Sequence, residues 1–171
     1  MSDPSAPASD WRHLALVLLT LWLLVTSPWI ALYRRVPADA GWLDYAHVAL
    51  GLVALVVTVA YVWSCGRRGR WRLYLPTSRS QMAEVGRDLG GLLRGRVPAA
   101  EGGGLFGLIE GLLLLALLAT AMTGAGWFLT QGSAEALAWR SHHALAVRGL
   151  LVLFVLHAVS VSLHLLEFLR D

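Results

Sequence analysis

Four long runs of apolar residues alternate with polar segments along the chain. Each run is long enough to cross a hydrocarbon core of roughly 30 Å as a helix. The polar segment at residues 66–104 separates the second run from the third, and shorter links join the others. The pattern predicts an all-α membrane protein, a bundle of four transmembrane helices in one domain over residues 1–171. The helices are expected at about residues 11–33, 44–65, 105–129 and 137–168.

Composition supports this class and excludes several others. A mean hydropathy of +0.61 and 57% hydrophobic residues are too high for an ordinary soluble domain. The pI near 9.6 does not indicate nucleic acid binding, because the arginines cluster beside the apolar runs. The single cysteine, Cys65, excludes an internal disulfide, a c-type haem attachment and a cysteine-ligated iron–sulfur cluster within this chain. The acidic, polar start lacks the basic region of a signal peptide, so the first run is expected to be retained.

The distribution of arginines predicts the orientation in the membrane. The outer connections hold only Arg34, Arg35 and Arg140. The positive-inside rule therefore places residues 66–104 and both termini in the cytoplasm. The arginines of the cytoplasmic segment are Arg67, Arg68, Arg70, Arg72, Arg79, Arg87, Arg94 and Arg96.

The cytoplasmic segment contains its own helical pattern. Met82, Val85, Leu89, Leu92 and Leu93 recur at helical spacing, with charged residues on the other faces. This pattern predicts a short cytoplasmic amphipathic helix between the second and third transmembrane helices. Such a helix either rests in solvent or on the membrane surface, or serves as a docking platform for a partner or one wall of a quinone site.

The fourth run carries ionisable residues at positions where a bilayer makes them costly, which marks them as functional candidates. His143 and His157 are fourteen residues apart, so their side chains project from one face within roughly 40° and lie about 21 Å apart along the axis. This spacing suits two stacked cofactors. It does not suit one metal ion, whose ligands must converge within about 2 Å of a point.

Topology assigns the histidines to leaflets. His13 opens the first run on the cytoplasmic side, and His47 opens the second run on the outer side. The fourth run crosses inward, so His143 lies toward the outer leaflet and His157 toward the inner one. Each leaflet then has one histidine on the fourth helix and one on another helix. Two b haems, each held by two histidines of a four-helix bundle, would use this arrangement.

Two further histidines admit alternatives. His142 lies about 100° around the helix from His143, so it is expected beside the ligand or on the surface. His164 is an alternative to His157 as the inner ligand, or part of a quinone pocket.

Other residues within the runs have candidate roles. Arg148 and Arg140 are candidate partners of haem propionates, and Arg148 alternatively reaches the outer interface. Glu110 is a candidate proton acceptor for quinone chemistry, or a carboxylate that stabilises a helix N-terminus. Gly51 and Gly149 either leave room for a macrocycle or allow close helix packing.

These features resemble the prokaryotic cytochrome b561 family and the related b-type cytochrome subunits of membrane formate dehydrogenases and nickel–iron hydrogenases. The resemblance implies two b haems in one cytochrome b domain, with ligand pairs His47/His143 and His13/His157. It also implies a bacterial inner-membrane location and electron exchange with the quinone pool. The matching stretches are Arg12-His13, Tyr45 to Gly51, Thr123-Gly124, and His143, His157 and His164 on the fourth run.

Three functions compete at this point. The chain is expected to be the quinone-linked cytochrome b subunit of a larger oxidoreductase. The alternative is a stand-alone cytochrome b561 with its own activity, such as a superoxide:ubiquinone oxidoreductase. A haem-free membrane anchor or a metal transporter is the alternative of another class. The expected partners are membrane lipid, quinone, and a redox subunit or a second copy of the chain, with no nucleic acid.

Overall fold

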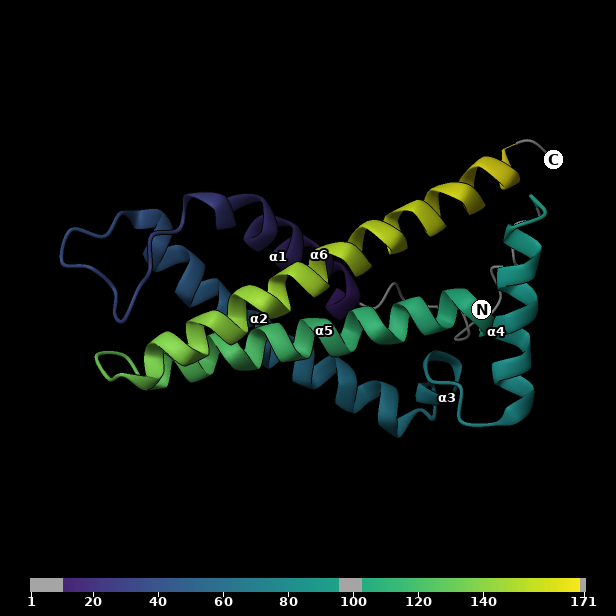
Figure 1. Cartoon of the computed structure of the whole chain (residues 1–171), viewed down its shortest axis with the longest axis horizontal. Helices are drawn as coiled ribbons and strands as arrows, with labels where there is room; N and C mark the ends of the chain where they lie inside the picture. Colours follow the sequence, from purple (N-terminus) through teal and green to yellow (C-terminus); the bar gives the residue numbers. More distant parts are fainter. Residues whose placement is uncertain (1–10, 96–102, 170–171) are drawn as a thin grey trace, which may run out of the picture. The chain divides into compact units, whose positions relative to one another are not determined.

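The structure, a computed structural model, describes residues 11–95 and 103–169, and within them it contains helices and no strand. The predicted all-α class is therefore confirmed (Figure 1). Arg96 and both chain ends, on which the predicted orientation partly depends, lie outside the described residues. The elements are α1 (Trp11–Thr26), the 3-10 turn η1 (Ser27–Trp29), α2 (Trp42–Arg67), α3 (Trp71–Tyr74), α4 (Arg79–Leu92), α5 (Gly104–Leu129) and α6 (Glu135–Phe168).

Among the residues that the structure describes, four helical segments are long and apolar enough to cross a membrane, as the hydropathy pattern predicts. Their exposed surfaces carry many large apolar side chains, which suit contact with lipid tails. The segments are Trp11–Trp29, Trp42–Arg67, Gly104–Leu129 and Glu135–Leu163.

The chain divides into two compact units, and α2, α5 and α6 each contribute residues to both. Unit 1 comprises Met1–Val62 and Leu118–Leu145. Unit 2 comprises Trp63–Leu117 and Ala146–Asp171.

In unit 1, the first helix ends earlier than the expected residue 33. Pro28 lacks an N–H donor, and α1 gives way to η1 after Thr26. The chain is extended at Ile30, and the next N–H, that of Ala31, donates to the Asp44 carboxylate at 3.0 Å. A tertiary hydrogen bond therefore takes the place of the next helical turn.

Hydrogen bonds join the α1–α2 connection to the α5–α6 turn in unit 1. The turn contains Gly132 at φ 85°, a backbone conformation that favours glycine. Both connections therefore lie on the same side of unit 1. The bonds run from Gly132 N to Arg34 O at 2.8 Å, from Trp127 Nε1 to Tyr33 O at 2.6 Å, and from Arg140 Nε to Leu32 O at 2.7 Å.

Small residues allow close helix contact in unit 1. Thr58 is fully buried, and its hydroxyl donates to the carbonyl oxygen of Ala54 at 2.6 Å. A Cβ atom added at Gly126 of α5 would lie 2.6 Å from the indole ring of Trp139 of α6. Only glycine permits this approach, which fixes α5 against the first turns of α6.

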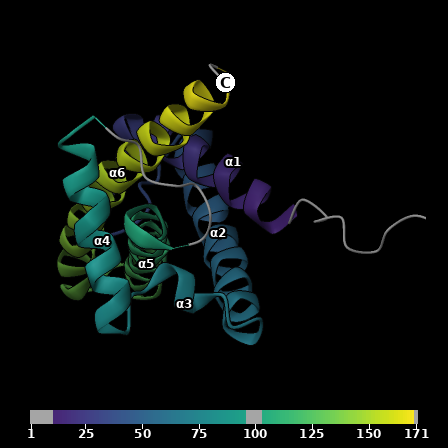
Figure 2. The same cartoon turned by 90° about the vertical axis from the view of Figure 1, so that its right-hand side faces the viewer.

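Unit 2 contains α3, α4 and the beginning of α5. Gly107 and Gly111 lie against the backbone carbonyls of Leu73 and Tyr74, where an added Cβ would clash. These two glycines therefore seat the end of α3 on α5. The helix α4 runs crosswise to α5, near the end at which α5 begins (Figures 1 and 2).

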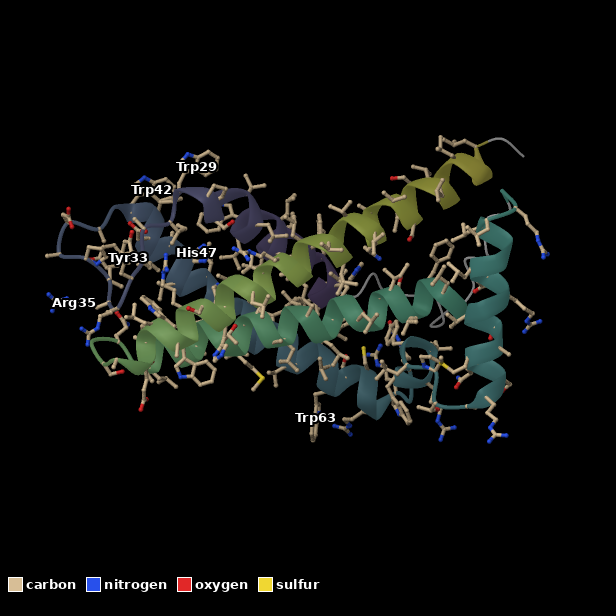
Figure 3. The ribbon with its side chains drawn as sticks, viewed as in Figure 1. Trp29, Tyr33, Arg35, Trp42, His47 and Trp63 are labelled. Atoms are coloured by element: carbon tan, nitrogen blue, oxygen red, sulfur yellow. The ribbon has the colours of Figure 1, made fainter. Side chains whose placement is uncertain are left out.

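Tryptophans near the ends of the apolar helices point away from their units. Trp29 and Trp42 of unit 1 expose 68% and 75% of their surface, and Trp63 of unit 2 exposes 68% (Figure 3). Such positions suit indole rings at a membrane–water interface.

Candidate functional site

Two of the predicted ligands, His47 and His143, come together in unit 1. His47 projects from the beginning of α2 (Figure 3), and His143 from the third turn of α6. Both side chains are half-buried, and the two rings are close enough to interact electrostatically. The pair thus comes from two different helices of unit 1, as a ligand pair for one haem requires.

The protonation of His143 follows from its hydrogen bond. Its Nδ1 lies 3.0 Å from the carbonyl oxygen of Thr120 on α5. A carbonyl only accepts, so Nδ1 carries the proton and donates it. In the neutral ring, Nε2 then keeps its lone pair. This is the tautomer that binds a metal through Nε2, with the other nitrogen fixed by a backbone acceptor.

Two more groups of α5 hold the same ring. The hydroxyl of Thr123 donates to the carbonyls of Ala119 and Thr120, so its oxygen can accept from His143 Nδ1 at 3.3 Å. A Cβ added at Gly124 would lie 3.3 Å from Cε1 and 3.4 Å from Nδ1 of the ring. The side chain of His143 is therefore restrained by several groups of α5.

His47 differs, because its Nδ1 is buried and has no hydrogen-bond partner among the described residues. A buried polar nitrogen without a partner is costly. A haem iron could take one nitrogen of this ring. The orphaned atom therefore fits a ligand position that the chain's own residues leave incomplete.

Open space lies beside α2 one turn after His47. A Cβ added at Gly51, one turn after His47, would meet no atom within 4 Å. A porphyrin beside His47 would need this face of α2 to be free. The ligand tautomer of His143, the orphaned His47 nitrogen and this space together fit a b haem.

Asp44 is a site residue that the sequence did not reveal. Its carboxylate is buried, and it accepts from Ala31 N at 3.0 Å and from Gly41 N at 3.2 Å. It also interacts electrostatically with His47, three residues later on α2. Asp44 thus fixes the beginning of α2, which carries His47. In the sequence, the only indication of this role is that Asp44 precedes His47 by three residues, about one helical turn.

The predicted inner ligands lie in different units. His13 of unit 1 is exposed, and its ring centroid lies 6.3 Å from that of Tyr61 at an interplanar angle of 30°. His157 of unit 2 is half-buried on α6. His164 lies on α6, but its side chain is outside the described residues. The inner ligand pair therefore stays a prediction.

The candidate propionate and proton-transfer residues, and His142, differ in their contacts and exposure. Arg140 stacks over the Tyr33 ring at 4.9 Å, in addition to its bond with Leu32. Its guanidinium therefore supports the α1–α2 connection, whatever else it binds. Arg148 and Glu110 are exposed on α6 and α5. His142 is exposed and meets the Trp139 ring edge-on at 6.0 Å, which agrees with a surface position.

Within residues 11–95 and 103–169, no three histidine, cysteine or carboxylate side chains gather as a metal-ion site. The family model of the prokaryotic cytochrome b561 proteins matches residues 7–168, nearly the whole chain. No curated protein matches the chain, and no solved structure matches it.

Proposed function

Because the chain belongs to the prokaryotic cytochrome b561 family, we propose that it carries electrons across the membrane through two b haems, one toward each leaflet. Family membership makes it a multi-pass membrane protein that transfers electrons through haem b. The number of haems, their ligands and the electron acceptor are parts of the proposal.

The outer haem would be held by His47 and His143. The observation that carries this assignment is the hydrogen bond from His143 Nδ1 to the carbonyl oxygen of Thr120, because it leaves Nε2 for iron. The unpartnered Nδ1 of His47 and the space beside Gly51 support the same position. When bound, the haem supplies one-electron iron chemistry, and the chain sets ligation, spacing and potential.

The inner haem would be held by His13 and His157, with His164 as the alternative to His157. The fourteen-residue spacing of His143 and His157 puts the two positions on one stripe of α6, about 21 Å apart along the axis. The arginines of the segment between α2 and α5 would keep that segment in the cytoplasm.

Quinone is proposed as the exchange partner near the inner haem. Quinone reduction takes up protons as well as electrons, and a carboxylate at the beginning of α5 could deliver them. Glu110 is exposed there and is the candidate. Arg148 and Arg140 are the candidates for the propionates of the outer haem. The chain would act as the membrane subunit of a larger oxidoreductase, or alone as a stand-alone cytochrome b561.

A redox-titrated spectrum with haem quantitation tests the proposal on purified protein. Wild type should hold two haems per chain, and His47→Ala and His143→Ala should each lose the same one. His157→Ala should lose the other, unless His164→Ala does so instead. His142→Ala, a control one residue from the ligand, should keep both. A purified, folded chain without b-type absorbance would overturn the proposal.

Co-purification after gentle solubilisation separates the two versions of the function. A stoichiometric redox subunit that leaves with the chain supports the membrane-subunit version. Quinone reduction by the isolated haem-loaded chain, with superoxide as the electron donor, supports the stand-alone version.

A further inference from the structure

The helix α4 of unit 2 is specified by its own sequence. The Ser78 side chain accepts from Gln81 N at 3.3 Å, and the Gln81 side chain accepts from Ser78 N at 3.1 Å. This reciprocal capping box satisfies donors at the first turn. The helix therefore has a defined beginning, and its faces can be assigned residue by residue.

One face of α4 is turned toward the rest of unit 2. Asp88 accepts from Leu105 N, at the beginning of α5, at 2.8 Å. Gln81 Nε2 donates to the carbonyl oxygen of Arg72 at 3.0 Å. Val85 and Leu92 are half-buried on the same side. This side is the packed face of α4.

The apolar residues expected on one face are divided between two. Met82, Leu89 and Leu93 are 55%, 53% and 85% exposed, whereas Val85 and Leu92 belong to the packed face. At 100° per residue, the three exposed residues lie within about 40° of one another and roughly 90° from the packed face. They form an apolar stripe that no described residue covers.

Arginines flank this stripe on the side away from the packed face. Arg79 and Arg87 are exposed and lie about 60° and 140° around the helix from Met82, and Arg94 is exposed in the turn after the helix ends at Leu92. Residues 66–95 contain seven arginines and two carboxylates, and one carboxylate, Asp88, is bonded to α5. The surface beside the stripe is therefore strongly positive.

The direction of α4 suits a membrane surface. It runs crosswise to α5, near the residue at which this candidate membrane span begins (Figures 1 and 2). A helix crosswise to a span lies along the membrane plane, and the beginning of the span is at the interface. Interfacial helices bury an apolar stripe at the acyl boundary and keep basic residues among the headgroups.

From these placements we infer that α4 is a docking helix for anionic phospholipid. Met82, Leu89 and Leu93 enter the acyl boundary, and Arg79, Arg87 and Arg94 bind negatively charged headgroups. The packed face holds the helix beside α5. Anionic lipid is favoured over a protein partner because the stripe, the arginines and the membrane plane meet on one helix.

Amide hydrogen exchange of the full haem-loaded chain in lipid nanodiscs tests the inference. The nanodiscs contain phosphatidylcholine alone, or phosphatidylcholine mixed with phosphatidylglycerol. Exchange in the α4 peptides should be at least about five-fold slower with the anionic lipid, since each basic residue near such a surface contributes roughly this factor. Both kinds of nanodisc contain the same scaffold protein and no other protein besides the chain, so a protein partner cannot cause a difference between them.

Variants identify the residues responsible. The triple change Arg79→Gln, Arg87→Gln and Arg94→Gln should abolish the difference between the two lipids. Leu89→Gln should weaken protection in both, whereas Ala83→Gln, at an exposed position off the stripe, should not. Unchanged exchange in the α2 and α5 peptides verifies that each variant is folded.

If the triple variant does not fold, raised salt on the wild type replaces it, because salt screens exposed charges. Equal exchange of α4 in the two lipids would overturn the inference. So would an anionic-lipid effect that survives the loss of the arginines or the addition of salt.

Discussion

The imidazole of His143 on α6 donates from Nδ1 to the backbone carbonyl of Thr120 on α5, at 3.0 Å. The acceptor is a main-chain atom within a helix, so it cannot rotate away. The bond fixes both the tautomer and the direction of the ring before any iron is bound. Preorganisation of this kind raises the basicity of the ligand and lowers the cost of ligation.

Thr123→Val tests the weaker of the two contacts to His143 Nδ1. The hydroxyl oxygen lies 3.3 Å from Nδ1, and the Thr120 carbonyl remains when it is removed. Loss of one acceptor makes the ring a poorer electron donor to iron. We expect the potential of the outer haem to rise by about 20–60 mV, the equivalent of roughly 0.5–1.5 kcal/mol in a one-electron couple.

Potentiometric titration of both haems measures this change, and the inner haem is the internal reference. Thr123→Ser keeps the hydroxyl and should restore the wild-type potential. An outer potential that falls, or an equal shift of both haems, contradicts the contact as described.

Asp44→Asn should destabilise the beginning of α2. The carboxylate accepts from two backbone N–H groups, those of Ala31 and Gly41, and an amide can accept from only one without turning its NH₂ toward the other. One N–H at this partly buried position is then unsatisfied, at a cost of about 1 kcal/mol. Thermal unfolding followed by circular dichroism in detergent should report a lower midpoint.

Asp39→Asn is the matched control for that experiment, because Asp39 lies exposed in the same connection. It removes the same charge and should leave the midpoint unchanged. Equal midpoints for the two variants would show that the two Asp44 hydrogen bonds contribute nothing to stability.

Hydropathy was sufficient to predict the membrane helices, because an apolar run of this length has few other stable conformations in a bilayer. The second helix was expected at residues 44–65 and is observed at Trp42–Arg67. The first helix was expected to continue to residue 33, but α1 gives way to η1 at Pro28, and the extended course beyond it depends on a bond between Ala31 and the distant Asp44. No local pattern contains the information on that bond.

The candidate site was predictable only in part, for the same reason. The spacing of the histidines identified His47 and His143, but the support of His143 is a backbone carbonyl. Its position depends on how closely Gly124 and Gly126 let α6 approach α5. On α4, periodicity found the apolar residues. It could not separate the packed Val85 from the exposed Leu89, because only tertiary contacts distinguish them.

Gly51→Ala tests whether a porphyrin lies against α2. An added methyl meets no protein atom within 4 Å. The chain alone should therefore tolerate it, and the helix should gain about 0.5–1 kcal/mol. A haem in that space would meet the methyl, so we expect lower occupancy of the outer haem at unchanged helix content.

Haem quantitation by pyridine haemochrome and circular dichroism give the two readouts. Gly66→Ala, in the same helix and equally free of neighbours, is the control and should keep full occupancy. Full occupancy in Gly51→Ala as well would place the macrocycle elsewhere.

Gly124→Ala and Gly126→Ala should separate ligand positioning from stability. The new methyl at position 124 lies 3.3 Å from Cε1 of His143, which is tight enough to move the ring by a few tenths of an ångström. The methyl at position 126 lies 2.6 Å from the indole of Trp139 and does not face the histidine. We expect Gly124→Ala to alter the potential and the electron paramagnetic resonance signal of the outer haem, with a small change in thermal midpoint.

Gly126→Ala should overpack the contact of α5 with α6, lowering stability by about 1–3 kcal/mol. Where it folds, its haem potentials should stay close to those of wild type. The contrast matters because both substitutions add one methyl to the same helix, two residues apart. If Gly124→Ala lowers only the thermal midpoint and leaves both haem signals unchanged, the position of the His143 ring does not govern ligation. The assignment of this histidine to the outer haem would then lose its main structural support.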